Sequence, residues 1–375
     1  WSLTRRLDPP GATVTIMTEG TDWDLRTELL VQSGDSARTI PIRLTEPKHV
    51  ITLDGPIDSV VLDPNYALLT PIEPKLSTGD LTRWLTSNVA VPRRIEAAER
   101  LANIGSTPAV AALVEALSSD GFWGFRKEIA RVLGGLGTPD ARSALMAELE
   151  VCKHPKVRRG IVASLSTLTG CDDVGRALAE IVRRGDPSYF VDAEAATAVG
   201  RVGLPDALEV LNIALGRESF NDVVRCGALI GLGWLRSDEA IDRLIEHAEP
   251  EHDELVRVAA VTALGRAGRD EPEIRPRVLD VFHGFRAETG LRFRLALIGA
   301  LETVSAVEAL PTLRALATSG GDARIRRRAL EAQRNVRSGV GLGEVRGELD
   351  RLKASHGRLL ERVEKMHTKG EPGGP

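Results

Sequence analysis

VRVAAVTALGRAG at residues 256–268 and VRCGALIGLGWLR at residues 224–236 are two copies of the segment that decides the fold. Six more copies align with them: RRIEAAERLANIG (93–105), FRKEIARVLGGLG (125–137), RRGIVASLSTLTG (158–170), VDAEAATAVGRVG (191–203), RFRLALIGALETV (292–304) and IRRRALEAQRNVR (325–337). Successive copies begin 32, 33, 33, 33, 32, 36 and 33 residues apart. Such a period predicts a repeat architecture, in which each unit buries its apolar face against its neighbours.

Each copy is predicted to be the second helix of a helix–turn–helix unit, because its apolar residues recur every three or four positions. Further helical segments lie between the copies, at 106–117, 138–149, 204–215, 237–248 and 306–316. Prolines fit the first turns of these segments and glycines fit the ends of the copies. They are Pro108, Pro139 and Pro205 at the starts and Gly105, Gly137, Gly170, Gly203 and Gly268 at the ends. Small residues inside the copies, such as Ala195-Ala196 and Ala259-Ala260, predict close helix packing.

Residues 12–70 follow a different pattern, in which apolar and polar residues alternate between turn-forming glycines and prolines. The predicted strands are 12–18, 24–32, 37–44, 49–53 and 58–64. From about Gly79 the period changes and strands do not return. The predicted fold is therefore mainly α: an α-solenoid of about eight helix pairs at 75–338, preceded by a small antiparallel β-sandwich at 1–74.

A C-terminal amphipathic helix is predicted at 339–367, with a disordered tail at 368–375. Its heptad positions are Leu342, Val345, Leu349, Leu352, His356, Leu359, Val363 and Met366. Two uses of this helix stay open: it docks on the last repeat, or it forms a dimer through residues 342–366.

The repeated unit resembles the HEAT family of helical repeats over about residues 91–337. The resemblance implies a ladder, with an Asp before the second helix and an Arg near its start. The Arg positions are matched by Arg94, Arg126, Arg159, Arg225, Arg257 and Arg326, and the Asp positions by Asp120, Asp186, Asp222, Asp253 and Asp322. The fourth copy departs, with Asp192 in place of Arg. We interpret the ladder as structural, with Asp capping a helix and pairing with Arg.

Composition argues against several classes of protein. The 49 Lys+Arg and 53 Asp+Glu residues give a net charge of -4, which argues against a globally basic nucleic-acid binder. Cys152, Cys171 and Cys226 are widely spaced and predict neither a disulfide framework nor a zinc knuckle, so we expect a reducing, cytoplasmic location. No apolar run approaches the roughly 18 residues of a membrane span.

No catalytic, metal or cofactor site is predicted in this chain. HExxH, which places two histidines on one helix face toward a zinc ion, does not occur, and neither do GxSxG or a P-loop. The nearest histidines, His247 and His252, are interpreted as part of a solvated turn. Some HEAT-repeat hydroxylases bind iron through His-Glu dipeptides, but no histidine here is followed by Glu.

One local charge bias stands out between residues 286 and 337, where ten Arg and no Lys accompany five acidic residues. Arginine suits bidentate contact with carboxylates or phosphates. The candidates for peptide or protein binding are Arg286, Arg292, Arg294, Arg324, Arg327 and Arg328. The alternative interpretation is that these arginines serve the ladder and solvated helix faces.

The order of a small sandwich, the segment IDSVVLDP at 57–64 and helical repeats resembles the C-terminal half of aminopeptidase N-like zinc metallopeptidases, especially bacterial members. The resemblance spans about residues 12–105 and includes Trp23-Asp24 and Trp84-Leu85. It implies a catalytic domain upstream of Trp1, carrying HExxH, a further Glu ligand to zinc and a Gly-x-Met-Glu-Asn motif. None of these is present in this chain.

The leading hypothesis is a non-catalytic region of a zinc aminopeptidase-like protein that shapes peptide access to an active site outside this chain. The alternative is a free-standing HEAT-repeat scaffold that binds a protein. A weaker third hypothesis, nucleic-acid backbone binding along 286–337, predicts a steep loss of affinity with salt. Whether the parent protein is an enzyme stays open.

Overall fold

The computed structural model describes residues 2–8, 11–18, 24–34, 36–68, 72–87, 89–235, 237–318 and 321–339. The chain divides into two compact units, Trp1–Val151 and Cys152–Pro375. This division falls within the helical repeats, so the sequence-based domain borders at 74/75 and 338/339 stay predictions. The predicted helix at 339–367 and tail at 368–375 lie outside the described residues, apart from residue 339 itself.

The predicted sandwich is confirmed, with two sheets packed around an apolar core. One sheet has the order β5-β2-β1-β7, from β1 (Ser2–Asp8), β2 (Gly11–Met17), β5 (Lys48–Leu53) and β7 (Glu73–Lys75). The other has the order β4-β3-β6, from β3 (Leu25–Ser33), β4 (Ser36–Leu44) and β6 (Ser59–Leu62). Alternate residues of β2, Ala12, Val14 and Ile16, are buried in the core. The short β7 pairs parallel to β1, whereas the other pairs are antiparallel.

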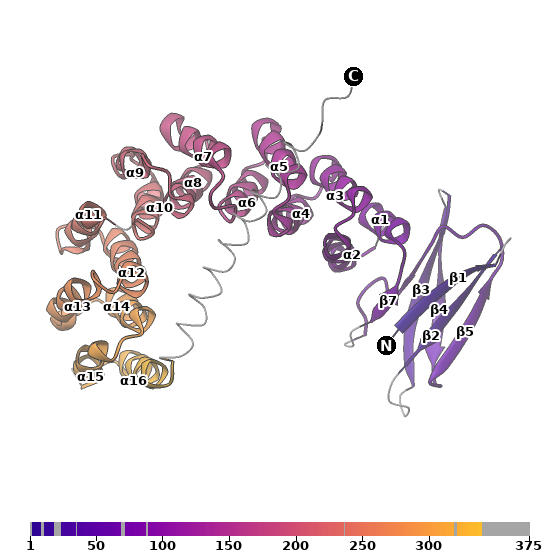
Figure 1. Cartoon of the computed structure of the whole chain (residues 1–375). Helices are drawn as coiled ribbons and strands as arrows, with labels where there is room; N and C mark the ends of the chain where they lie inside the picture. Colours follow the sequence, from indigo (N-terminus) through magenta and orange to yellow (C-terminus); the bar gives the residue numbers. More distant parts are fainter. Residues whose placement is uncertain are drawn as a thin grey trace, which may run out of the picture. The chain divides into compact units, whose positions relative to one another are not determined.

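Sixteen α-helices follow one another as eight pairs in the described part of the chain (Figure 1). The first members are α1 (Thr78–Thr86), α3 (Thr107–Ser119), α5 (Pro139–Val151), α7 (Asp172–Arg184), α9 (Ala207–Leu215), α11 (Asp238–Ala248), α13 (Arg275–Gly284) and α15 (Leu310–Thr318). The second members are α2 (Val91–Ile104), α4 (Trp123–Leu136), α6 (Pro155–Leu165), α8 (Tyr189–Val202), α10 (Val223–Leu232), α12 (Glu254–Asp270), α14 (Leu291–Val304) and α16 (Ala323–Ser338). The second members coincide with the eight sequence copies, which confirms the predicted solenoid.

Several predicted helix ends hold and others are wrong. Gly105, Gly137 and Gly203 end their helices in the left-handed conformation, with φ of 62°, 63° and 77°. Gly268 instead lies inside α12, which continues to Asp270. Pro205 lies in a turn before α9, and residues 307–309 form a short 3-10 helix before α15.

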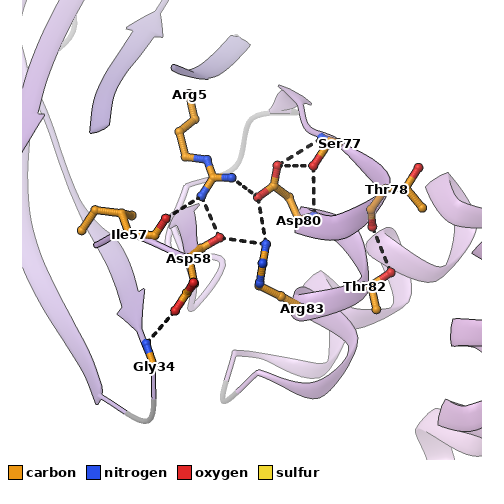
Figure 2. A network of polar contacts seen from close by, with 9 residues as sticks. All are labelled: Arg5, Gly34, Ile57, Asp58, Ser77, Thr78, Asp80, Thr82 and Arg83. Atoms are coloured by element: carbon orange, nitrogen blue, oxygen red, sulfur yellow. Dashed lines mark hydrogen bonds and ion pairs between the residues drawn. The ribbon is translucent and has the colours of Figure 1, made fainter. Parts of the chain in front are cut away.

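A polar network joins the sandwich to α1, as Figure 2 shows. Arg5 of β1 pairs with the buried carboxylate of Asp80 and donates from Nη1 to the carbonyl oxygen of Asp58 at 2.7 Å. Arg83 donates to the same carbonyl at 3.1 Å. Asp80 also forms a capping box with Ser77, which satisfies backbone N–H groups at the start of α1. The first helix is thereby fixed to the sheets.

Asp63, near the end of the IDSVVLDP segment, stabilises the turn that follows β6. Asp63, at a φ of 52°, is buried, and its carboxylate accepts hydrogen bonds from Thr27 Oγ1 and from two backbone N–H groups of the next turn. Arg93 of α2 donates from Nε to the carbonyl oxygen of Asp63 at 3.2 Å and pairs with Glu96 at 2.7 Å. Its guanidinium also lies 4.0 Å from the ring centroid of Tyr66. These contacts hold α2 against the strand ends.

In the second unit, the even-numbered helices pack side by side in the order α6-α8-α10-α12-α14-α16, and the odd-numbered helices form a second layer (Figure 1). The even-numbered layer is closest where a glycine faces a neighbouring backbone. A Cβ atom at Gly200 would lie 2.0 Å from the carbonyl oxygen of Gly231, and one at Gly227 would lie 2.4 Å from that of Ala193. Because real Cβ atoms do not approach so closely, α10 can pack on α8 only through glycine at these positions.

Candidate interaction surface

Arginines near the starts of the second helices cap the ends of the first helices. Each donates from Nε to a backbone carbonyl oxygen at the end of the preceding helix, where carbonyls have no partner within the helix. The donor–acceptor pairs are Arg94–Leu85 at 2.7 Å, Arg126–Leu117 at 2.7 Å, Arg225–Leu215 at 3.0 Å and Arg257–Ala248 at 2.9 Å. The contacts of these four predicted ladder residues are therefore made within the protein.

The same arginines also contact carboxylates. The ion pairs are Arg94–Asp120, Arg126–Glu148, Arg225–Asp222 and Arg257–Glu288. In two units the partner of the arginine is a glutamate, where the resemblance to HEAT repeats implies an Asp. Asp253 precedes α12 without a side-chain cap. Arg326 in α16 is exposed, and its side chain has no hydrogen bond or ion pair with any described residue.

In the third unit, Arg158 and not the predicted Arg159 has the ladder geometry. Arg158 donates to the carbonyl oxygen of Cys152 at 3.2 Å and pairs with Asp186 at 2.7 Å. Arg159 is exposed and pairs with Glu194 of α8 at 2.9 Å. Successive residues of a helix point about 100° apart, so only one of two adjacent arginines can face the preceding helix.

The fourth unit carries the charges of the ladder in reverse. Asp192 occupies the arginine position in α8 and is 2% exposed. Arg217, which follows α9, donates from Nη1 to Asp192 Oδ2 at 2.6 Å and from Nη2 to the carbonyl oxygen of Val182 at 2.7 Å. Asp192 Oδ1 is buried without a hydrogen-bond partner among the described residues, and burial raises the pKa of Asp192, opposed by Arg217.

The six arginines predicted to bind a partner do not form one group. Arg294 is buried within α14, so its guanidinium faces the protein interior. Arg328 pairs with Glu302. Arg324 pairs with Asp322 at the N-cap of its own helix, at 2.7 Å, and this contact lowers the pKa of Asp322 to about 2.

The remaining three are exposed. Arg286 donates to a backbone carbonyl of its own turn at 2.8 Å. Arg292 lies 3.8 Å from Glu254, and Arg327 lies 3.7 Å from Glu331, as loose surface pairs. Pairs of this kind contribute little to stability and leave the guanidinium accessible. Three of the six arginines are therefore accessible on the surface, and the predicted binding role of the set stays a prediction.

A different group lies at the C-terminal ends of α8, α10 and α12. Trp234 directly follows α10 and is half-buried. Arg201 at the end of α8 and Arg266 in α12 place their guanidinium carbons 5.2 Å and 4.0 Å from its ring centroid. The three residues come from consecutive repeats and occupy nearly the same repeat position. We call them the Arg–Trp–Arg group; the local density of arginine along the sequence does not reveal it.

Nearer the starts of these helices, and also on α14, small and apolar side chains are partly exposed at matching positions. Ala193, Cys226, Val258 and Leu295 lie near the starts of α8, α10, α12 and α14, and each is half-buried. Contacts across the helices keep the positions in register: Cys226 Sγ lies 3.6 Å from the carbonyl oxygen of Leu255. One turn later the same face continues with the half-buried Ile230. We call these five half-buried residues the apolar row.

The described residues include no group of three or more His, Cys, Asp or Glu side chains that would hold a metal ion. Burial raises the pKa of the Cys226 thiol to about 11, so this thiol is not a nucleophile near neutral pH. A shallow hollow of about 390 Å³ lies between Glu249, Val281, Phe285 and Glu288. Glu288 in this hollow is already paired with Arg257. No described helix is long and apolar enough to cross a membrane.

His247 and His252 stack, with ring centroids 4.7 Å apart and ring planes at 12°. His247 Nδ1 lies 2.8 Å from the carbonyl oxygen of Arg243. Burial lowers the pKa of His247 below its usual 6.5, with a further contribution from His252. The predicted solvated turn is therefore partly buried at His247.

Acidification should destabilise the protein through His247. Because the pKa of His247 is lowered on folding, the unfolded chain binds more protons below about pH 6.5, and the free energy of unfolding falls as the pH drops. His247→Gln should reduce this dependence in urea titrations between about pH 7.5 and about pH 5.5. An unchanged dependence in the variant would show that another group is responsible.

The family described as HEAT repeats matches residues 84–166, 175–265 and 212–289, which together make up more than half of the chain. Among solved structures, the complex of CpcE and CpcF of phycocyanin lyase from Nostoc sp. PCC7120 is 22% identical, over 66% of this chain and 96% of that chain, with a TM-score of 0.42. Human deoxyhypusine hydroxylase is 20% identical, over 69% and 96%, with a TM-score of 0.30.

Aminopeptidase A of Legionella pneumophila is 11% identical, with a TM-score of 0.50 over 88% of this chain and 48% of that chain. This chain thus spans about half the length of the aminopeptidase. No curated protein sequence matches this chain.

Proposed function

Because this chain belongs to the HEAT-repeat family, we propose that it is a scaffold that binds another protein along the exposed face of its even-numbered helices. The observation that carries this proposal is the apolar row. Four neighbouring helices present half-buried side chains at matching positions, and the layer behind them is held by its own ladder contacts. A continuous face of this kind on a rigid layer suits a protein partner.

The choice of face can be tested by adding charge to it. Ile230→Glu combined with Val258→Glu should weaken binding of a partner by about tenfold or more, because a charge buried at the centre of an interface has no partner. The matched control is Ile213→Glu in α9 of the odd-numbered layer, where the side chain is 42% exposed. Circular dichroism and the thermal midpoint would show that each variant is folded.

Partners would be captured by cross-linking to the full chain, and each would then be purified for a binding titration. Loss of binding in the double variant with retention in Ile213→Glu supports the proposal. Equal binding of wild type and the double variant, or loss only in the control, would place the interaction elsewhere.

We also propose a second candidate function, as the non-catalytic region of a zinc aminopeptidase-like protein that shapes peptide access to an active site outside this chain. One observation favours it: the match to aminopeptidase A covers 88% of this chain, so it extends beyond the repeats into the sandwich. Sequencing the DNA upstream of the codon for Trp1 tests the idea. An open reading frame that encodes HExxH supports it, and an initiation codon directly before Trp1 rules it out.

A further inference from the structure

We propose that the Arg–Trp–Arg group is the specificity site of the scaffold and binds an acidic segment of the partner protein. This inference rests on the proposed scaffold function and names the chemistry of the partner. Trp234 follows Arg201 by 33 residues and precedes Arg266 by 32, so the group repeats with the period of the solenoid. The side chains therefore come together because adjacent even-numbered helices pack in register.

Arg201 carries a charge that no carboxylate of the described chain neutralises. Arg201 is exposed, and its guanidinium has no hydrogen bond or ion pair with any carboxylate in the described part of the chain. Arg94, Arg126 and Arg257, by contrast, each hold a carboxylate. In the described part of the chain, the guanidinium of Arg201 lies over the face of Trp234, which orients it without neutralising its charge.

The indole of Trp234 offers a partner both an apolar ring and a hydrogen-bond donor. Trp234 is half-buried, and no hydrogen bond joins its ring N–H to a described residue. The ring contacts two guanidinium groups, and these contacts restrict its motion, so it loses little conformational entropy when a partner covers it. Its N–H supplies a neutral donor on the same indole whose ring contacts the guanidinium of Arg201. Together they match a carboxylate, which accepts several hydrogen bonds at once.

The surroundings favour an acidic protein segment over a single small anion. Most of the apolar row lies on the same helices, so a segment with alternating acidic and apolar residues could contact both the arginines and the apolar side chains. The carboxylates that follow Trp234 most closely along the chain, Asp238 and Glu239, lie in the first turn of α11, where acidic residues stabilise a helix start. Neither forms an ion pair with Arg201 in the described part of the chain, so the positive charge of Arg201 is not cancelled there.

The test uses the full chain and a fluorescently labelled peptide of alternating Glu and Leu residues. Trp234→Ala, and Arg201→Gln with Arg266→Gln, should each weaken binding by about tenfold or more, the effect of losing an interface hot spot. Arg314→Gln, an exposed arginine of α15 in the odd-numbered layer, removes charge without touching the group and should bind like wild type. A peptide with Gln in place of Glu should bind wild type as weakly as the variants bind the acidic peptide.

Three outcomes would overturn the assignment. If binding is unchanged in Trp234→Ala and in the double arginine variant, the Arg–Trp–Arg group is not the binding site. Equal loss in Arg314→Gln indicates attraction by net charge only. Preference for a single-stranded oligonucleotide over the acidic peptide, lost in the same variants, would assign the group to phosphates. If Ile230→Glu with Val258→Glu still abolishes partner binding while the group variants do not, the scaffold stands and only the acidic specificity fails.

Discussion

Replacing Gly200 by valine should lower the free energy of unfolding by about 3 kcal/mol or more, among the larger effects of a single substitution. A Cβ atom at this position would lie 2.0 Å from the carbonyl oxygen of Gly231 on the neighbouring helix. The obstacle is backbone, so no side-chain rotation relieves it, and α8 must move away from α10. The gain in helix propensity on replacing glycine, about 1 kcal/mol or less, is too small to compensate.

Gly299→Ala in α14 is the matched control. No atom lies within 4 Å of a Cβ at Gly299, so the helix gains propensity without a clash and should become more stable by up to about 1 kcal/mol. Urea denaturation followed by circular dichroism measures both variants. Hydrogen exchange would also show whether the loss in Gly200→Val begins at α8 and α10, as a stack of nearest-neighbour units requires. Similar stability of the two variants would contradict close packing through Gly200.

Arg217→Ala should cost about 3 kcal/mol or more, because it leaves a buried carboxylate without its cation. Asp192 is 2% exposed, and Arg217 is the cation that contacts it. The deficit should shrink in acid. Burial already raises the pKa of Asp192, so the folded variant takes up a proton above the pH at which the unfolded chain does, and stability falls as the pH rises through that range.

Exchanging the two residues should restore much of the loss. In Asp192→Arg with Arg217→Asp, the arginine stands where the other units have one, and its guanidinium can reach both the end of α7 and the new carboxylate. We expect each single exchange to destabilise the protein, since like charges then meet, and the double variant to recover at least half of that loss in thermal denaturation. No recovery would mean that this pair is held by geometry specific to its present orientation.

The period and the pattern of apolar residues were sufficient to predict the eight helix pairs and the sandwich before them. Short-range details were harder to predict. Arg158 and Arg159 are both consistent with the repeat spacing, and only the packing of α6 decides which one faces the preceding helix. The parallel pairing of β7 with β1 was missed, because a strand of three residues that contains Pro74 has no pattern to detect.

The candidate site was predicted less well than the fold. Counting arginines along the chain selected 286–337, where Arg294 is buried and Arg324 and Arg328 are paired. Comparing equal positions in successive copies would have placed Arg201, Trp234 and Arg266 in one column. In a repeat protein, residues one period apart are spatial neighbours. The residues at one repeat position in successive copies therefore predict a shared surface better than the number of arginines in one segment does.

The reversed pair of Asp192 and Arg217 also restricts how the chain can be rebuilt. In the design of repeat proteins, helix pairs are often treated as equivalent units that can be deleted, duplicated or reordered. If α7–α8 were moved to another place in the array, Asp192 would face the carboxylate that pairs with arginine in most other units. If a helix pair with the common arginine were inserted before α9, that arginine would face Arg217. The fourth helix pair and the one that follows it carry complementary charges at their contact, so they must be moved together.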